Sequence, residues 1–441
     1  MNKIINQKIL TYIVFFFIVC SFFFGFYFNE NSAGAGGYTR EIGWILENIE
    51  IFKNNDLKNA IFHKDLYGNR PPLIYILNEI FNPFFYEYEK YRVFVFTLSL
   101  AGPIFIYLNL KKNHPNTNSE LLLLLSSIIL LSPFYRTSAY WALNENYGLV
   151  AVILSLVCLN FFLKQNDIEK KINKYFYLTI FFSSLSIYFD QKHLIVTMVC
   201  FFSVFLSKID IRTKLYTFLL YAFFSIPYLI LINEWGGIVP AKTQALNTNT
   251  ITNLSRLGKM HFYHLGYAST IISFYLFPLL MLKEGNILQN IQRFFSSKWC
   301  YVIISIPLIY IYLIYINYDF KSYTVDEYWI GLGVVHKSSL ILFSNLKYQE
   351  IFTYIIFFFS WIVIFLYVEK KITDCLIIIF FLSFSILIWP LMQEYFDPIL
   401  IILALMAFKT KIKLNYYNVF FTFLYFFIFL ACANIYYLKI F

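Results

Sequence analysis

Apolar runs long enough to cross a lipid bilayer fill most of this chain, and no other feature constrains its fold as strongly. The hydrocarbon core of a bilayer is about 30 Å thick, so a helix of roughly 20 apolar residues crosses it. Inside the membrane every backbone amide needs an internal partner, which a helix supplies. Because 59% of the 441 residues are hydrophobic and only 14% are charged, a soluble globular domain is excluded. The pattern predicts an all-α, polytopic transmembrane helical bundle.

The apolar runs predict about thirteen spans within a single transmembrane domain that covers residues 1–441. The first run follows a charged start and lacks a small-residue cleavage site, so we interpret it as an uncleaved first helix. The expected spans are Ile9–Phe28, Tyr91–Leu110, Glu120–Phe134, Tyr147–Leu163, Tyr175–Phe189, His193–Ser207, Leu215–Asn233, Phe262–Leu282, Trp299–Asn317, Ile351–Val368, Asp374–Pro390, Phe396–Phe408 and Val419–Leu438.

Short basic segments separate alternate spans and predict the orientation of the chain. Lys164–Lys174, Lys208–Lys214 and Lys409–Lys413 are three of them. Lys and Arg accumulate on the cytoplasmic side of a membrane, so we expect the N-terminus inside. Contact of these segments with anionic membrane lipids accounts for the net charge of +10, and no nucleic-acid partner is needed.

The first external loop, residues 29–90, is the main organised segment outside the expected spans. Its apolar residues recur at spacings of three and four with charged residues between them, which predicts an amphipathic helix on the membrane surface. Thr39 stands where the N-cap of that helix belongs. The apolar stripe consists of Ile42, Ile45, Leu46, Ile49 and Phe52.

A proline pair, Pro71-Pro72, divides this loop. The two rings disfavour a helix before them, so Asp65 and Arg70 are expected on a rigid, extended segment. The apolar segment that follows, Leu73–Phe85, is expected to dip into the membrane or to pack on the bundle.

Side chains that could perform chemistry lie almost entirely in the expected external segments. Five of the six histidines are among them, whereas the interiors of the spans contain almost no charge. Buried intramembrane charge is the usual mark of an ion-coupled pathway, so the pattern weighs against a secondary transporter. The external groups are Glu41, His63, Asp65, Arg70, Arg136, Glu145, Asp190, Lys192, His193, Lys242, His261, His264, Asp326, Glu327, His336, Glu394 and Asp397.

An enzyme that acts on a lipid-carried substrate needs a carboxylate to accept a proton, cations to hold a phosphate, and an apolar groove for the lipid. Glu41 and Asp65 supply the carboxylates, and the Phe- and Tyr-rich spans supply the groove. Structural alternatives stay open, since Glu41 can complement a helix dipole and the cations at span ends can anchor them at lipid headgroups. The cations are Arg70, Arg136, Lys192 and Lys242.

Two further pairs have competing interpretations. His261 and His264 share a helix face at a spacing of three, but the sequence fixes no third ligand, so no metal site is predicted. Glu394 and Asp397 are paired carboxylates, a helix-end cap, or partners in a salt bridge to an external Arg or Lys.

Several stretches, in order along most of the chain, carry a further pattern: Tyr38-Thr39-Arg40-Glu41-Ile42, Asp65–Tyr75 with its proline pair, Phe189–His193, Gly236–Lys242 followed by His261-Phe262, and Glu394–Pro398. This order resembles the GT-C superfamily of membrane glycosyltransferases, which use polyprenyl-phosphate sugars. It is most similar to the dolichyl-phosphate-glucose-dependent alpha-1,2-glucosyltransferases that complete the lipid-linked oligosaccharide for N-glycosylation. Three charges depart from that family's pattern, at Arg40, Asp190 and Glu394, so we expect a distant relative with a different acceptor.

The resemblance implies an inverting glycosyltransferase without metal or cofactor. A polyprenyl-phosphate sugar would be the donor, and a glycan or lipid-linked molecule the acceptor, on the non-cytoplasmic face. We expect Glu41 to be the general base, with Asp65 in reserve. The donor phosphate would be held by Arg136, Lys192, His193 and Lys242, and the substrate pocket would be shaped by Arg70, His261 and Glu394.

Two alternatives stay open at this stage. An O-antigen-type polymerase or ligase would have a similar number of spans, but it would depend on arginines in a large late loop, and Tyr318–Glu350 contains none. A lipid-linked glycan flippase or transporter would need polar residues along a central cavity. The departures from the eukaryotic pattern favour a bacterial inner membrane with a periplasmic active face over the lumenal face of the endoplasmic reticulum.

Overall fold

The computed structural model of the chain describes residues 2–33, 41–68, 70–169, 172–244, 260–283, 287–321, 333–368, 371–410 and 412–437. Every regular element within these ranges is a helix, which confirms the predicted all-α class. The chain divides into two compact units: residues 1–254, 405–407 and 426–441 form unit 1, and residues 255–404 and 408–425 form unit 2.

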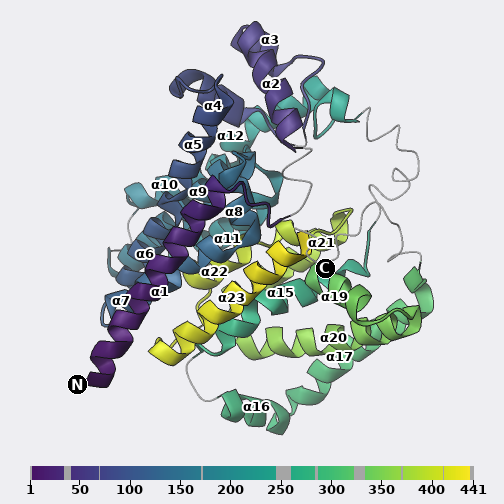
Figure 1. Cartoon of the computed structure of the whole chain (residues 1–441). Helices are drawn as coiled ribbons and strands as arrows, with labels where there is room; N and C mark the ends of the chain where they lie inside the picture. The colour runs from purple at the N-terminus through teal and green to yellow at the C-terminus, as the bar shows by residue number, and fades with distance from the viewer. Residues whose placement is uncertain are drawn as a thin grey trace. The chain divides into compact units, whose positions relative to one another are not determined.

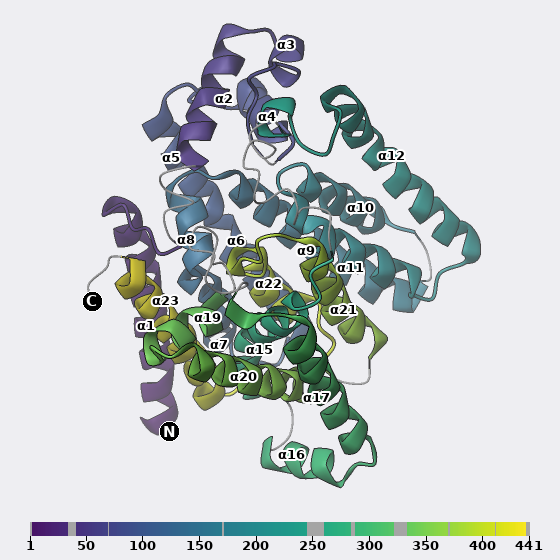
Figure 2. The same ribbon diagram turned by 90° about the vertical axis from the view of Figure 1, so that its right-hand side faces the viewer.

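Unit 1 contains the N-terminal helices. Figure 1 shows α2, α3 and α4 at the end of this unit opposite the N-terminus of α1. In Figure 2, α10 lies against α9, α11 and α12. Its elements are α1 (Asn2–Tyr27), α2 (Ile42–Asn54), α3 (Leu57–Ile61), α4 (Leu73–Phe81), α5 (Tyr88–Ser99), α6 (Ala101–Asn113), α7 (Ser119–Ser127), η2 (Ile128–Leu131), α8 (Pro133–Tyr140), α9 (Asn144–Glu169), α10 (Lys174–Ile187), η3 (Gln191–His193), α11 (Leu194–Phe205) and α12 (Ile211–Trp235).

Unit 2 is built around α15, which packs against α19, α20 and α21. Two helices, α22 (Ile399–Met406) and α23 (Tyr416–Tyr437), have residues in both units. The other elements of unit 2 are α15 (His264–Leu280), α16 (Ile287–Ser296), α17 (Trp299–Asn317), α19 (Gly333–Leu342), α20 (Leu346–Tyr367), α21 (Ile372–Leu387) and η4 (Gln393–Tyr395).

Seven helices in the described part of the chain are long and apolar enough to cross a membrane, or eight if one bent pair is a single span. That pair, Ser119–Leu131 and Pro133–Tyr140, is bent by 70° where Pro133 forces Ser132 out of the helical conformation. Shorter apolar helices occupy several of the other predicted spans, so the count of about thirteen stays a prediction. The seven are Gln7–Tyr27, Tyr88–Asn113, Asn144–Gln165, Ile211–Trp235, Cys300–Asn317, Leu346–Tyr367 and Tyr416–Tyr437.

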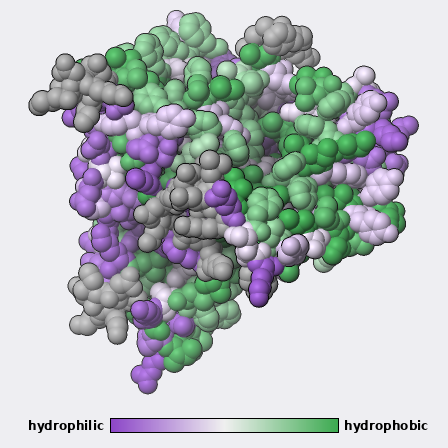
Figure 3. Space-filling view, turned by 90° about the horizontal axis from the view of Figure 1, so that it is seen from below, coloured by the Kyte–Doolittle hydropathy of each residue, from purple (hydrophilic) through white to green (hydrophobic). Residues whose placement is uncertain are grey.

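Large apolar side chains cover much of the surface. Phe223 on α12 and Tyr312 on α17 are each 63% exposed, and Figure 3 shows broad hydrophobic areas on one face. Such faces are unfavourable in water and are typical of helices in contact with lipid. These features fit a multi-pass integral membrane protein.

The predicted amphipathic helix is α2, and the residues expected at its start lie outside the described ranges. Ile45, Ile49 and Phe52 are buried, and the ring of Phe52 packs 5.4 Å from that of Tyr75 on α4. The face that we expected to rest on the membrane therefore packs on protein. Of the predicted stripe, Leu46 remains exposed.

Candidate functional site

Four separate segments of unit 1 bring charged side chains together, and we name this set the charge cluster: Glu41, Arg70, Glu145, Asp190 and Lys192. Glu41 immediately precedes α2, and Arg70 lies just before the proline pair that leads into α4. Glu145 is in the first turn of α9, and the other two lie between α10 and α11. All five are thus placed at helix ends or in loops.

Arg70 is the centre of the charge cluster. Its Nε donates to Oδ2 of Asp190 at 3.2 Å, and its Nη2 lies 3.4 Å from Oε1 of Glu41. The same Nη2 donates to Oε1 of Glu145. One guanidinium therefore holds three carboxylates, a use of its planar fork that a lysine could not reproduce.

Lys192 is the second cation of the cluster, and only 6% of its side chain is exposed. Its Nζ lies 3.3 Å from Oδ2 of Asp190 and 3.8 Å from Oε1 of Glu145. Three carboxylates thus face two cations. Burial favours the neutral acid and would raise the pKa of Asp190, but Lys192 and Arg70 lower it below its usual value. Asp190 is therefore ionised at neutral pH.

Local hydrogen bonds set the turn that carries Asp190 and Lys192. Asp190 is the N-cap of η3, and its Oδ1 accepts from the backbone N–H of Lys192 at 3.0 Å. Nδ1 of His193 lies 3.0 Å from the carbonyl oxygen of Ser186, which makes Nδ1 the donor nitrogen. The other nitrogen, Nε2, then carries a lone pair, so neutral His193 cannot donate a hydrogen bond to a phosphate from that atom.

The loop that carries Arg70 is fixed from two sides. Asn48 on α2 accepts from the N–H of Tyr67 at 3.0 Å and donates to its carbonyl oxygen at 2.6 Å. The hydroxyl of Thr243 accepts from the N–H of Gly68 at 2.9 Å and lies 3.1 Å from its carbonyl oxygen. These bonds, together with the proline pair, place Arg70 without any covalent cross-link.

Two other predicted site residues, Asp65 and Lys242, line a surface groove of about 520 Å³ beside α2. Lys242 pairs with Glu47 at 3.4 Å, and Asp65 lies 3.9 Å from Nδ1 of His63. Asp65 is more exposed than Glu41, with 54% of its side chain accessible against 18%. The groove is completed by Gly43, Leu46, Glu50 and Ile51.

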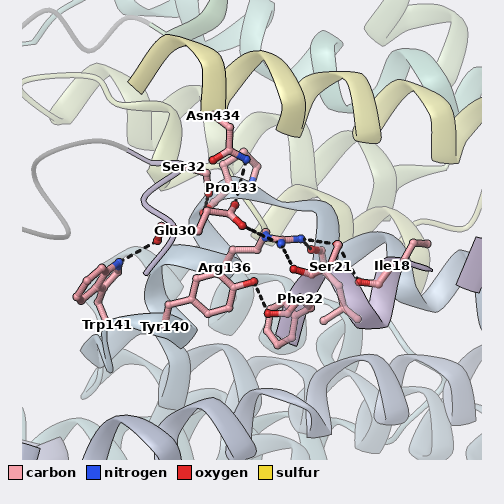
Figure 4. Close-up of polar contacts among 11 residues, drawn as sticks. Ile18, Ser21, Phe22, Glu30, Ser32, Pro133, Arg136, Tyr140, Trp141 and Asn434 are labelled. Atoms are coloured by element: carbon pink, nitrogen blue, oxygen red, sulfur yellow. Dashed lines mark hydrogen bonds and ion pairs between the residues drawn. The ribbon is translucent and has the colours of Figure 1, made fainter. Parts of the chain in front are cut away.

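Arg136 has partners of its own in unit 1, which Figure 4 shows. Its Nη2 lies 2.8 Å from Oε2 of Glu30 and donates to the carbonyl oxygen of Ser21 at 2.6 Å. Oε1 of Glu30 accepts from Asn434 at 3.1 Å. Only 2% of the Arg136 side chain is exposed. These contacts tie α1, α8 and the end of α23 together.

His261 and Glu394 belong to unit 2. The ring of His261 packs 5.1 Å from that of His264 and 5.2 Å from that of Trp389. Glu394 lies on η4, where the neighbouring Gln393 donates to the hydroxyl of Tyr275 at 3.0 Å. Their predicted roles in a substrate pocket stay predictions. Within the described ranges, no three His, Cys, Asp or Glu side chains are grouped to hold a metal ion.

The structure therefore brings Glu41, Arg70, Lys192 and His193 together, and Asp65 with Lys242 in the adjoining groove. Glu145 and Asp190 were among the external groups but had no predicted role in the site, although they hold both cations. The sequence offered one signal for them, since each is an acidic residue at the external end of an expected span.

Comparison with known proteins finds no matching family model, no matching curated protein and no matching solved structure. The resemblance to GT-C glycosyltransferases stays a prediction based on the motifs of the sequence.

Proposed function

We propose that this protein is an integral membrane glycosyltransferase of the GT-C type. It transfers a sugar from a polyprenyl-phosphate donor to a glycan or lipid-linked acceptor, on the side of the membrane that α2, α3 and α4 face. The proposal includes the arrangement of about thirteen spans and a location in a bacterial inner membrane with a periplasmic active face.

One observation carries the proposal: the carboxylate of Glu41 contacts Arg70, a largely buried cation. Arg70 shares two carboxylates with the second cation, Lys192, and one of these, Glu145, lies in the first turn of the long apolar helix α9. A proton acceptor and a holder for an anionic leaving group are the two elements that transfer from a sugar phosphate requires. The apolar helices fit the polyprenyl chain of the donor.

In the proposed reaction, Glu41 accepts the proton of the acceptor hydroxyl as its oxygen attacks the anomeric carbon. The bond between that carbon and the phosphate oxygen breaks, and the electron pair leaves with the polyprenyl phosphate. Arg70 and Lys192 stabilise the negative charge that develops on the departing phosphate. Attack from the side opposite the leaving group inverts the anomeric configuration.

The contacts of Arg136 and His193 change the roles that we assign to them. Only 2% of the Arg136 side chain is exposed, against 17% for Arg70, and neutral His193 presents a lone pair, so Arg70 takes the phosphate-binding role in the proposal. Lys242 and Asp65, in the groove beside α2, are assigned to the acceptor side.

The test is an assay of the purified protein in lipid nanodiscs with a panel of polyprenyl-phosphate sugars and acceptor glycans. Glu41→Gln keeps the size of the side chain and removes the base, so transfer should fall by a factor of about 10² to 10⁴. Glu87→Gln is the matched control, because Glu87 is a glutamate of the same loop whose side chain is 58% exposed.

Two outcomes would count against the proposal. Wild-type protein that transfers no sugar from any donor of the panel would refute the activity. Parental transfer by Glu41→Gln would refute the assignment of the base, and Asp65→Asn would then identify or eliminate the reserve carboxylate.

A further inference from the structure

Asn146, in the first turn of α9, has two buried side-chain atoms without a partner, but it lies on a different helix face from Gly148. Three further polar atoms, at the start of α9 and in η3, are buried without a hydrogen-bond partner among the described residues. They are Oδ1 of Asn144, Oε2 of Glu145 and Nε2 of His193. The three residues are 5%, 7% and 0% exposed. A buried polar atom without a partner is unfavourable, so each such group calls for an explanation.

Glu145 has two different oxygens. Oε1 is held by Arg70 and lies 3.8 Å from Nζ of Lys192, whereas Oε2 has no partner. As a carboxylate oxygen that faces two cations through its partner oxygen, Oε2 is an acceptor of hydrogen bonds. The side of Glu145 that faces away from Arg70 is thus ready for a donor group.

His193 is oriented by its other nitrogen. Nδ1 donates to the carbonyl oxygen of Ser186, so Nε2 is an acceptor as well. The ring packs directly against Gly148 of α9, where an added Cβ would also lie 3.1 Å from Cβ of Phe189. The absence of a side chain at Gly148 therefore allows the ring to sit against α9.

Asn144 and Glu145 share a helix face with Gly148, since they precede it by four and three residues. The electrostatic field of Glu145 acts on His193, in agreement with this placement. The three unpartnered atoms therefore belong to one region, at the start of α9 and beside η3.

The chemistry of these atoms defines the ligand. All three accept hydrogen bonds, so they suit a group that donates several, and they repel an anion through their lone pairs. A neutral molecule rich in hydroxyl groups meets both conditions, whereas a second phosphate does not. The adjacent Arg70 and Lys192 are placed to hold a phosphate attached to that molecule.

We propose that Asn144, Glu145 and His193 form a subsite for the hydroxyl groups of the sugar carried by the donor. This subsite rests on the proposed glycosyltransfer and adds to it the recognition of a neutral hexose by acceptor atoms. Sites that hydrogen-bond a substrate hydroxyl discriminate strongly against analogues that lack it, because the buried partner is then unpaired.

The experiment measures binding of the donor, and transfer is not needed. Wild-type protein and two His193 variants in nanodiscs are titrated with polyprenyl-phosphate glucose and with its 2-, 3-, 4- and 6-deoxy analogues. His193→Asn keeps a donor near the position of Nδ1 for Ser186 and removes Nε2. His193→Gln keeps an acceptor near Nε2 and removes the Nδ1 donor, so the pair separates orientation of the ring from recognition of the ligand.

We expect His193→Asn to bind the parent donor about tenfold more weakly than wild type, as the loss of one hydrogen bond implies. It should bind one of the deoxy analogues as well as wild type does, because the hydroxyl that Nε2 recognises is absent from that analogue. Glu145→Gln, which gains an N–H donor, should no longer discriminate between the parent donor and a different one of the deoxy analogues.

If His193→Asn and wild type bind every donor with equal affinity, the subsite is overturned and the proposed function still stands. That result is expected if Nε2 faces only ordered water. Wild-type protein that binds neither these donors nor any other polyprenyl-phosphate sugar of the panel used for the transfer assay would overturn the proposed function and the subsite together. Thermal unfolding of each variant, measured without donor, shows whether it is folded.

Discussion

The Nη2 atom of Arg70 lies 3.4 Å from Oε1 of Glu41, so the proposed general base and a proposed phosphate-binding cation are in direct contact. The same guanidinium bonds to Asp190 and Glu145, whose side chains are both 10% exposed. Glu41 is the most exposed of the three carboxylates, at 18%, and its contact with Arg70 is the longest. A phosphate that approaches Arg70 would therefore compete first with Glu41.

Replacement of Arg70 by lysine should destabilise the protein although it conserves the charge. An ammonium group cannot reproduce the fork that serves three carboxylates, so at least one of them loses a charged hydrogen bond. We expect a loss of about 1.5 to 3 kcal/mol in the free energy of unfolding. Arg70→Gln, which leaves the carboxylates to repel one another, should cost about 3 to 5 kcal/mol.

Unfolding in mixed micelles measures both changes. Arg212→Lys is the control, since Arg212 is exposed at the start of α12, and it should change stability by no more than about 0.5 kcal/mol. An Arg70→Lys protein as stable as wild type would show that the shared guanidinium is not required.

The ion pair of Arg136 and Glu30 should contribute to stability and not to binding of the donor. Removing one partner leaves a buried charge, so Glu30→Gln is expected to cost about 3 to 5 kcal/mol. The double variant Glu30→Gln with Arg136→Met should be more stable than the sum of the single changes predicts, which a double-mutant cycle measures. A weaker affinity of the folded double variant for polyprenyl phosphate would support the earlier prediction that Arg136 holds the phosphate.

Asp190 predicts a specific dependence of stability on pH. Its pKa is lowered in the folded protein by Lys192 and Arg70, against the effect of burial, which raises it. A carboxyl group whose pKa is lower in the folded than in the unfolded protein stabilises the fold at pH values above its unfolded pKa. This contribution is lost as the pH falls from the unfolded pKa towards the folded pKa. The stability difference between wild type and Asp190→Asn should thus be constant from pH 8 to about pH 5 and shrink below 3.8.

Thermal unfolding across this range provides the measurement. Asp56→Asn serves as the control, because Asp56 is an exposed N-cap of α3 and asparagine caps a helix equally well. A difference between wild type and Asp190→Asn that grows as pH falls would contradict the prediction.

Two helical glycines should respond in opposite directions to the same substitution. Gly148→Ala places a methyl group against the buried ring of His193, and such overpacking costs about 1 to 3 kcal/mol. Gly43→Ala on α2 meets nothing within 4 Å, so it should stabilise the protein by about 0.5 to 1 kcal/mol through helix propensity. Equal effects of the two changes on stability would contradict the packing of His193 against α9.

The sequence predicted the helices better than the pairing of charges. Periodicity and apolar runs indicated α2 and the helical class, because both are local properties of the chain. Asp190 was interpreted as a reversed charge, but in the fold it contacts Arg70, 120 residues earlier. Glu30 and Arg136 are 106 residues apart, and only the packing of α1 against α8 brings them together. A single sequence does not indicate which of its distant charges meet.

Counting spans from apolar runs had a second limit. α10 and α21 are apolar but only 14 and 16 residues long, and both have buried residues packed on neighbouring helices. A short apolar helix is compatible with a buried position in the bundle as well as with a membrane crossing, and composition does not separate the two. The buried faces of these helices became visible only in the fold.

Cysteine labelling tests the sidedness on which the proposed function depends. Asp65 and Lys242 line one groove at the end of unit 1 that carries α2, whereas Lys164 is exposed near the opposite end of α9. In a background without native cysteines, Asp65→Cys and Lys242→Cys should react with a membrane-impermeant maleimide added to intact spheroplasts. Lys164→Cys should react only after the membrane is made permeable, because a 26-residue helix spans about 39 Å and separates the two sides. Labelling of Lys242→Cys and Lys164→Cys from the same side would remove the basis for a reaction on the non-cytoplasmic face.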